Sequence, residues 1–223
     1  ALGVLVLLYK TPLKNEKVLK TVTDVFATRI SAEYRRDTLQ SELKATAYID
    51  YVTRLPNRTK LLTYINNIRS ELLNKDSQAL LMLFDLDHFG EVNRKYGYDV
   101  GDKVIKMVGD RLSSYTSESV FISRSGGDEF AVVIPKVKAD ITNLTNVHWT
   151  AIQAIVNQTC NVGNRKININ CTMGAVVFPS QLQANFEVLG AAEQALLHAK
   201  EHGRGRYTFF DPSFLSNVSC SFM

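Results

Sequence analysis

The stretch SRSGGDEFAVVIP, residues 123–135, decides the fold of this chain. Its second half is a short apolar run ended by proline, which is typical of a buried strand, and VFISR from Val120 is typical of another. Ser125, Gly126 and Gly127 lie between the two runs, and glycines supply the positive φ angles that tight turns need. The stretch therefore predicts a β-hairpin.

The hairpin does not explain the two acids that follow the glycines. Asp128 and Glu129 are adjacent, and neighbouring carboxylates repel each other and disfavour the start of a strand. Another buried strand, ALLMLFDLD, ends in a further pair of acids, Asp85 and Asp87. If the two strands are neighbours, Asp85, Asp128 and Glu129 converge at one sheet edge. Clustered carboxylate oxygens suit Mg²⁺, which usually takes one or two of them plus substrate phosphates. For Asp87 we favour a cap of the following helix.

The composition bounds the class of protein. The chain has 223 residues, 45% of them hydrophobic and 22% charged, as in ordinary globular proteins. Its net charge of +4 suits a phosphorylated small ligand, and no basic run demands nucleic acid. The cysteines Cys160, Cys171 and Cys220 lack metal-like spacing, which indicates reduced thiols and a cytoplasmic location. The apolar opening ALGVLVLLY is too short to span a bilayer, so we expect no membrane insertion.

The first part of the chain predicts a strand and a long helix. Residues 2–9 form the apolar strand, and a helical pattern runs from Asn15 to about Ala47. A helix beyond thirty residues is more typical of a coiled-coil connector than of a globular domain. The alternative is a single amphipathic helix packed on its own domain.

The second part, from about Asp50, predicts an α+β fold. Asn57 is placed to cap a helix that carries Leu61 and Leu72. The following elements are expected in order: the strand 79–87, helices at 89–96 and 102–114, the hairpin, a helix at 147–159, strands at 165–169 and 172–178, a helix at 186–202 and the strand 206–210. This order indicates a ferredoxin-like central antiparallel sheet flanked by helices.

Other polar groups point to a nucleotide. His88, Phe89 and Gly90 open a helix, so their backbone N–H groups are placed to hold phosphate oxygens. Lys200 and Arg204 are spaced i, i+4 in ALLHAKEHGRGR, which would put two cations on one helix face beside the same phosphates. A solvated helix end that matches the helix dipole is the equally good alternative for these two.

Asn93 and Asp102 lie on the segments after the strand at 79–87. A carboxylate that accepts from N1–H and N2–H, together with an amide, can read guanine. Taken alone, each of the two residues is more plausible as a helix cap.

These residues resemble the GGDEF domain of the diguanylate cyclase family from about Ala47 to Asp211. The name-giving motif stands here at 126–130. Four other signatures match in order: DYVTRLPNR at 50–58, FDLDHFGEVN at 84–93, YGYDVGD at 96–102 and AAEQALLHAKEHGRGR at 191–206. Several spaced motifs over the whole domain make the resemblance specific.

The resemblance implies a nucleotidyl-cyclase-like fold and a reaction. Each domain would bind one GTP with Mg²⁺ or Mn²⁺, and two domains in a homodimer would condense two GTP into cyclic di-GMP with release of two pyrophosphates. It implies metal binding by Asp85, the Leu86 carbonyl and Asp128, while Glu129 would bind metal or assist deprotonation of the 3′-hydroxyl. It further implies substrate contacts from these residues: Asn93 and Asp102 on guanine, Lys200 and Arg204 on the β- and γ-phosphates, and the backbone of His88, Phe89, Gly90, Gly126 and Gly127.

Four positions depart from the family pattern. Gly90 stands where the family usually has lysine, Arg94 where it usually has aspartate, Tyr98 for a frequent histidine and Arg54 for a common glycine. None of these removes a named catalytic group, so we expect tuned rather than absent activity. The Arg-x-x-Asp of the family's product site is replaced at 117–120 by Ser-Glu-Ser-Val, which predicts no product inhibition through that site.

Both ends resemble pieces of neighbouring domains. Residues 1–47 resemble the last strand and helix of a GAF-like sensory domain, residues 48–211 the catalytic domain, and residues 212–223 a tail or linker. RYTFFDPSF at 206–214 resembles the segment that leads into an EAL phosphodiesterase domain. The second hypothesis is therefore a GTP-binding module, weak in catalysis, that regulates an attached EAL domain.

Overall fold

The computed structural model describes residues 16–72, 77–137, 140–179 and 188–214. The expected strand at 2–9 lies outside these ranges. The chain divides into two compact units, residues 1–47 and residues 48–223.

In the first unit, the described part is the long helix α1, which runs from Glu16 to Tyr48 and matches the helix expected from Asn15 to about Ala47. Its apolar side chains Val22, Val25, Phe26 and Ile30 are 43–61% exposed. Among the described residues, none of the helices combines the length and the apolar character that a membrane crossing requires.

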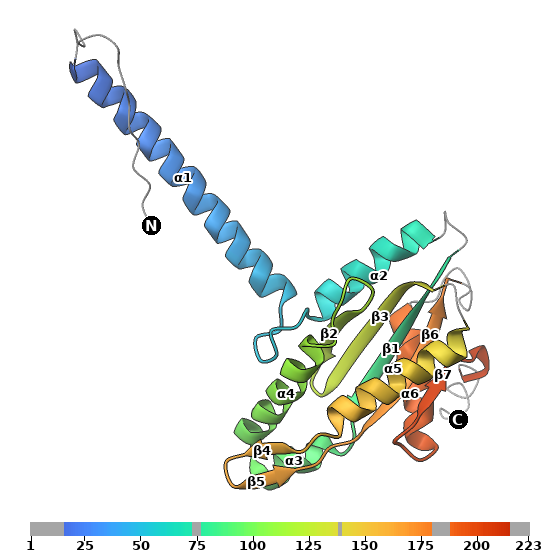
Figure 1. Cartoon of the computed structure of the whole chain (residues 1–223). Helices are drawn as coiled ribbons and strands as arrows, with labels where there is room; N and C mark the ends of the chain where they lie inside the picture. The colour runs from blue at the N-terminus through green and yellow to red at the C-terminus, as the bar shows by residue number, and fades with distance from the viewer. Residues whose placement is uncertain (1–15, 73–76, 138–139, 180–187, 215–223) are drawn as a thin grey trace, which may run out of the picture. The chain divides into compact units, whose positions relative to one another are not determined.

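The second unit is built on a mixed five-stranded sheet with the order β2-β3-β1-β6-β7 (Figure 1). The strands are β1 Gln78–Leu86, β2 Phe121–Gly126, β3 Glu129–Val137, β6 Cys171–Phe178 and β7 Tyr207–Phe209. The central pairings are antiparallel, as expected, and β7 adds one parallel edge strand beside β6. Cys160–Val162 (β4) and Arg165–Ile167 (β5) form a separate two-stranded ribbon.

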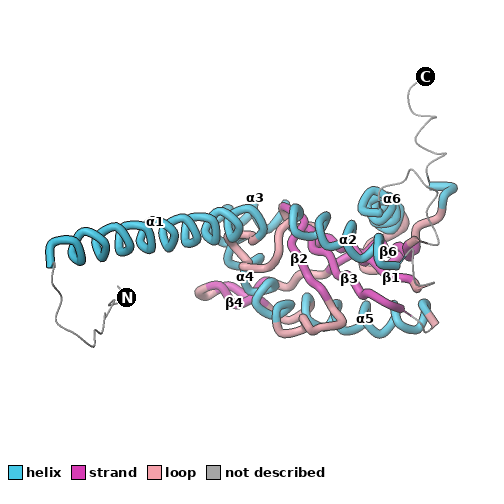
Figure 2. Tube along the Cα trace, turned by 90° about the horizontal axis from the view of Figure 1, so that it is seen from above, coloured by secondary structure: helices cyan, strands magenta, loops and turns pink. Residues whose placement is uncertain are grey.

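Helices cover both faces of the sheet, because the strands alternate between two apolar cores. α2 (Arg58–Leu72) and α6 (Val188–Glu201) pack on the core that contains Leu81, Leu83 and Val133. The other core contains Met82, Phe84 and Val132 and takes side chains from α4 (Tyr98–Ser113) and α5 (Ile141–Val156). Figure 2 shows the sheet between α2 and α6 on one side and α5 on the other.

Helix starts follow local capping. Asn57 caps α2 as predicted, since its Oδ1 accepts from the Lys60 N–H at 3.1 Å. α5 begins at Ile141, six residues before its expected start, because the Asp140 carboxylate accepts from the N–H groups of Thr142 and Asn143. α4 begins at Tyr98 instead of Asp102, after Gly97 with φ 86°. α3 (Phe89–Tyr96) has the predicted bounds.

Candidate active site

A row of three polar residues crosses the sheet at one end. Glu129 on β3 is the register partner of Asp85 on β1, and Asp85 is in turn the partner of Thr172 on β6. Side chains alternate along a strand, so Asp85 shares the face of Leu81 and Leu83, the face covered by α2 and α6. The side chains of this row therefore face α2 and α6. The sequence predicted Asp85 and Glu129 here, and the strand pairing brings them together.

Lys200, in the last turn of α6, reaches this row. Its Nζ lies 2.9 Å from Asp85 Oδ2, and the two side chains are only 24% and 11% exposed. Burial raises the pKa of Asp85, and the Asp128 and Asp87 charges raise it further, while the hydrogen bond from Lys200 lowers it. Burial and the neighbouring acids thus outweigh the Lys200 contact in setting the pKa of Asp85.

Glu129 lies in a similar field. Burial raises the pKa of Glu129, and the charges of Asp85 and Glu193 add to this effect, while Lys200 and Arg58 oppose it. Arg58, the first residue of α2, donates to Ser125 Oγ at 3.0 Å and pairs with Glu193 of α6 at 3.0 Å. Sequence reasoning missed Arg58 and Glu193. Their signal was the Asn-Arg of LPNR and an acid two turns before Lys200 on the same helix.

We expected Asp87 to cap α3, but it binds the start of β6 instead. It is buried, and its Oδ1 accepts from Thr172 Oγ1 at 2.6 Å. The residue at the N-cap of α3 is His88, which makes no side-chain cap bond. Asp87 thus turns inward because a buried hydroxyl lies beside it on the neighbouring strand.

Arg204 lies beyond the end of α6, so the expected i, i+4 helical spacing from Lys200 was wrong. The helix ends at Glu201, and Arg204 adopts φ 43° in the following turn. Its Nη1 nevertheless lies 3.6 Å from Asp87 Oδ1. The next residue, Gly205, donates its N–H to Thr172 Oγ1 at 2.9 Å, which fixes the turn to the sheet. Both predicted phosphate cations therefore gather at the predicted edge.

The turn between β2 and β3 is open on its outer side. Gly126 and Gly127 have φ 148° and 53°, values that favour glycine, and a Cβ added to either would meet nothing within 4 Å. The Asp128 carbonyl accepts from the Leu86 N–H at 3.2 Å, which joins the turn to the end of β1. The backbone of the turn is exposed, and its contact with a ligand stays a prediction.

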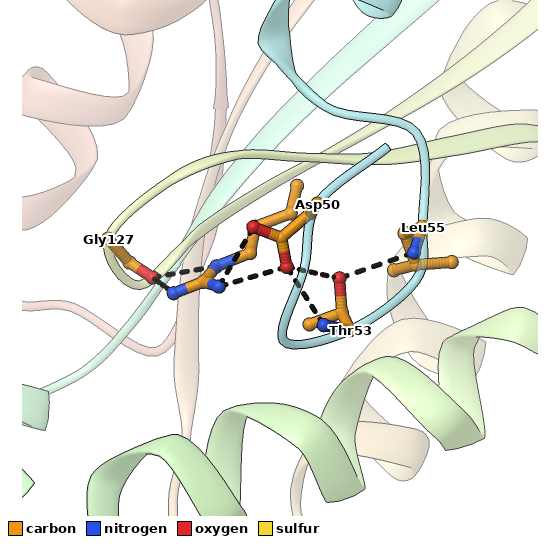
Figure 3. A network of polar contacts seen from close by, with 5 residues as sticks. Asp50, Thr53, Leu55 and Gly127 are labelled. Atoms are coloured by element: carbon orange, nitrogen blue, oxygen red, sulfur yellow. Dashed lines mark hydrogen bonds and ion pairs between the residues drawn. The ribbon is translucent and has the colours of Figure 1, made fainter. Parts of the chain in front are cut away.

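An ion pair that the sequence did not reveal holds this turn from behind (Figure 3). Arg124 donates to the Gly127 carbonyl from Nε at 3.0 Å and from Nη2 at 2.6 Å. Its Nη1 lies 3.0 Å and 3.1 Å from the two carboxylate oxygens of Asp50. Burial alone would raise the pKa of Asp50, but hydrogen bonds from Thr53 and the Arg124 guanidinium hold it below its usual range.

Asn93 lies beside the segment that carries Asp102. A Cβ added at Gly101 would collide with the Asn93 side chain, so the amide lies directly on the α-carbon of the residue before Asp102. The start of α3 is likewise open, since a Cβ at Gly90 would meet nothing within 4 Å. The structure thus places the two residues predicted to read guanine on neighbouring helices, Asn93 on α3 and Asp102 on α4. Arg94 and Tyr98 are exposed.

The donor set fits a hard divalent cation, although the described residues hold no preformed metal centre. Within the described ranges, no three His, Cys, Asp or Glu side chains gather as a metal centre. The acids Asp85 and Glu129 are nevertheless register partners, and burial, followed by the neighbouring carboxylates, raises the pKa of both. Neighbouring carboxylates, completed by substrate phosphates, are the ligands that Mg²⁺ prefers.

The sequence model described as "Diguanylate cyclase, GGDEF domain" matches residues 47–206. The bifunctional diguanylate cyclase/cyclic di-GMP phosphodiesterase MucR of Pseudomonas aeruginosa is 29% identical over 201 residues, which cover 90% of this chain and 28% of MucR. The diguanylate cyclase DgcP of the same organism is 31% identical over 160 residues, 72% of this chain and 23% of DgcP. The chain spans much less than two thirds of the length of either relative.

Among solved structures, the coiled coil and GGDEF domain of DgcB from Caulobacter crescentus, in complex with c-di-GMP, superposes with a TM-score of 0.75. The two sequences are 21% identical, and the match covers 85% of this chain and 99% of the DgcB chain. At this identity the likeness shows the fold.

Proposed function

The chain belongs to the diguanylate cyclase GGDEF family, and on that premise we propose that it condenses two GTP molecules into cyclic di-GMP with release of two pyrophosphates. Each domain supplies one half site, and two GTP-loaded domains act together. The observation that carries the proposal is the meeting of Asp85, Glu129 and Lys200 at one sheet edge, since Asp85 pairs in register with Glu129 and binds Lys200 at 2.9 Å.

The residues divide the work by chemistry. Asn93 and Asp102 hold guanine, and Lys200 and Arg204 hold the β- and γ-phosphates. The N-terminal backbone of α3 at His88, Phe89 and Gly90 and the turn at Gly126 and Gly127 receive the remaining phosphate oxygens.

The acids hold the cation and the reacting hydroxyl. Asp85, the Leu86 carbonyl, Asp128 and Glu129 are the groups that would hold Mg²⁺ or Mn²⁺. The bound ion would neutralise charge on the transferred phosphoryl group and on pyrophosphate. Glu129 is the acid we assign to the 3′-hydroxyl, because burial and the Asp85 charge raise its pKa and so make it a better proton acceptor.

The test is turnover of GTP with Mg²⁺, in which pyrophosphate and cyclic di-GMP are followed together. The double variant Asp128→Ala, Glu129→Ala serves as the blank. We expect one cyclic product for every two pyrophosphates, and none from the variant. Pyrophosphate without cyclic product, or product that survives in the variant, would contradict the proposal.

A second candidate is a GTP-binding module that regulates an attached EAL phosphodiesterase domain. It is supported by the departures at Gly90 and Arg94 and by the bifunctional name of MucR. In this case, GTP binds without turnover and changes phosphodiesterase activity in the longer protein. The preceding segment is then the end of a GAF-like sensory domain that feeds the cytoplasmic GGDEF domain through α1. Tight GTP binding with no cyclic product at dimer-forming concentrations would favour this candidate.

A further inference from the structure

Both cations assigned to the phosphates are already bound to acids. Lys200 Nζ lies 2.9 Å from Asp85 Oδ2, and Arg204 Nη1 lies 3.6 Å from Asp87 Oδ1. The proposed function assigns Asp85 to a divalent cation and Lys200 to a phosphate, so neither residue has the partner that the loaded site would give it. The structure and the proposed loaded site thus differ in which anion binds Lys200 and which cation binds Asp85.

The Lys200–Asp85 contact is protected from solvent. The side chains are 24% and 11% exposed, compared with 56% and 57% for the Lys106–Asp110 pair on the surface of α4. A sheltered pair is screened less by water and salt than an exposed one, so its attraction is stronger. The Lys200–Asp85 pair is therefore not an incidental surface contact.

Helix α6 carries a second ion pair over the same edge. Glu193 lies seven residues before Lys200, two turns along the same face, and it binds Arg58 of α2 at 3.0 Å. Lys200 binds Asp85 of β1 and Glu193 binds Arg58 of α2, so two ion pairs hold α6 over the carboxylates. Lys200 can change its partner while the helix stays in place.

A divalent cation and the Lys200 ammonium repel each other when both lie on the Asp85 carboxylate, so each weakens the binding of the other. A nucleotide phosphate offers Lys200 a new anion, and in doing so it frees Asp85.

We propose that Lys200 is an internal counter-ion that holds the place of the divalent cation on Asp85 and moves to a phosphate when nucleotide binds, so that cation and nucleotide bind cooperatively. The inference rests on the proposed function for the identity of both ligands. In the absence of nucleotide, Lys200 weakens cation binding; in its presence, Lys200 strengthens nucleotide binding. One residue thus has opposite effects on the two ligands.

The test measures Mn²⁺ binding in the absence of nucleotide, by the electron paramagnetic resonance signal of the free ion. Lys200→Met should bind Mn²⁺ at least about tenfold more tightly than the wild type, because the competing charge is removed. Lys106→Met, which removes a lysine from an exposed pair with Asp110, is the matched control and should change nothing. Adding Asp85→Asn to Lys200→Met should abolish the gain.

The second arm adds a GTP analogue that cannot react. In the wild type the analogue should raise Mn²⁺ affinity, and in Lys200→Met this rise should shrink, while affinity for the analogue falls about tenfold. If Lys200→Met fails to melt cooperatively, Lys200→Gln takes its place. Unchanged or weaker Mn²⁺ binding in the lysine variant, or an equal gain in Lys106→Met, would overturn the inference. These equilibria need no turnover, so a failure of the cyclase assay leaves them interpretable.

Discussion

At the scale of single residues, Gly101 has a role that its sequence position does not announce. The Asn93 side chain occupies the space where a Cβ at Gly101 would lie. Gly101→Ala should therefore displace the Asn93 amide and weaken GTP binding about tenfold, about the worth of one hydrogen bond. Thermal stability should hardly change, because alanine favours a helix interior over glycine and offsets the crowding.

The control for Gly101→Ala is Gly190→Ala in α6, where a Cβ would meet nothing within 4 Å. This variant should bind GTP like the wild type. Isothermal titration of both variants checks the assignment. Unaltered GTP affinity in Gly101→Ala would show that Asn93 does not contact the base.

Glu129 provides a prediction about pH. Burial first, and then the Asp85 and Glu193 charges, raise the pKa of Glu129. The protonated form is therefore more favourable in the folded metal-free protein than in the unfolded chain. Ionisation of Glu129 therefore costs stability as the pH rises through this raised pKa. Glu129→Gln should melt at a higher temperature than the wild type at neutral pH, and the difference should vanish below the ordinary pKa of a glutamate.

The same variant should lose at least about a hundredfold in cyclic product formation, the usual contribution of a general base. Stability and activity thus move in opposite directions, as is common in active sites. Melting curves across pH, recorded with a chelator, provide the measurement. A wild type as stable as Glu129→Gln at neutral pH would show that the acid is well solvated.

Motif residues could be predicted from the sequence, while their partners could not. Asp85 and Glu129 could be predicted because each acid borders an apolar run, Asp85 near the end of β1 and Glu129 at the start of β3. Arg58 and Glu193 were missed because they are far apart in the sequence, and neither local motif shows that the two residues pair. Arg204 was assigned to a helix face because periodicity continues past Glu201, although the following glycine turn ends the helix.

At the scale of elements, the turn of residues 50–57 is tied to the β2–β3 hairpin. The Arg124 N–H donates to the Pro56 carbonyl at 2.9 Å, and its guanidinium joins Asp50 to the Gly127 carbonyl. Asp50 lies two residues after the end of α1 in the sequence. The glycine turn is therefore held by the segment that follows the long helix.

Asp50→Asn should loosen the glycine turn. The side chains of Arg124 and Asp50 are only 10% and 16% exposed, so loss of the charge should cost about 1–3 kcal/mol of stability. Cyclic product formation should fall as well. Because the pKa of Asp50 is lowered, its contribution is complete above the ordinary aspartate pKa and is lost as the pH falls through the lowered value.

Asp110→Asn is the control for this prediction, since it removes an exposed carboxylate paired with Lys106. It should change stability by less than about 1 kcal/mol. Chemical unfolding at neutral and acidic pH compares the two variants. An Asp50→Asn variant as stable and as active as Asp110→Asn would show that the ion pair does not hold the turn.

Element types were more predictable than their pairing. Hydrophobic periodicity gave α1 and α3 nearly to the residue, because both helices begin and end at clear changes of pattern. The parallel pairing of β7 with β6 was not anticipated, because β7 is a strand of three residues whose direction depends on where the turn after α6 brings the chain. The start of α5 was missed because Asp140 was not recognised as its N-cap residue.

At the scale of the whole molecule, the proposed reaction needs two copies of the chain. One domain presents one set of the residues proposed to read guanine, Asn93 and Asp102, and the proposed product contains two guanines. The exposed apolar side chains of α1, Val22, Val25, Phe26 and Ile30, are spaced as a helix pair requires. Association of two chains is therefore the natural point of control.

The most direct measurement is the rate of cyclic di-GMP formation per chain, at saturating GTP and Mg²⁺, over a concentration series that crosses from monomer to dimer. Light scattering on the same samples gives the fraction of dimer. The account predicts that the rate per chain follows the dimer fraction and vanishes with it. Monomers that form cyclic product as fast as dimers would contradict the two half sites on which the account depends.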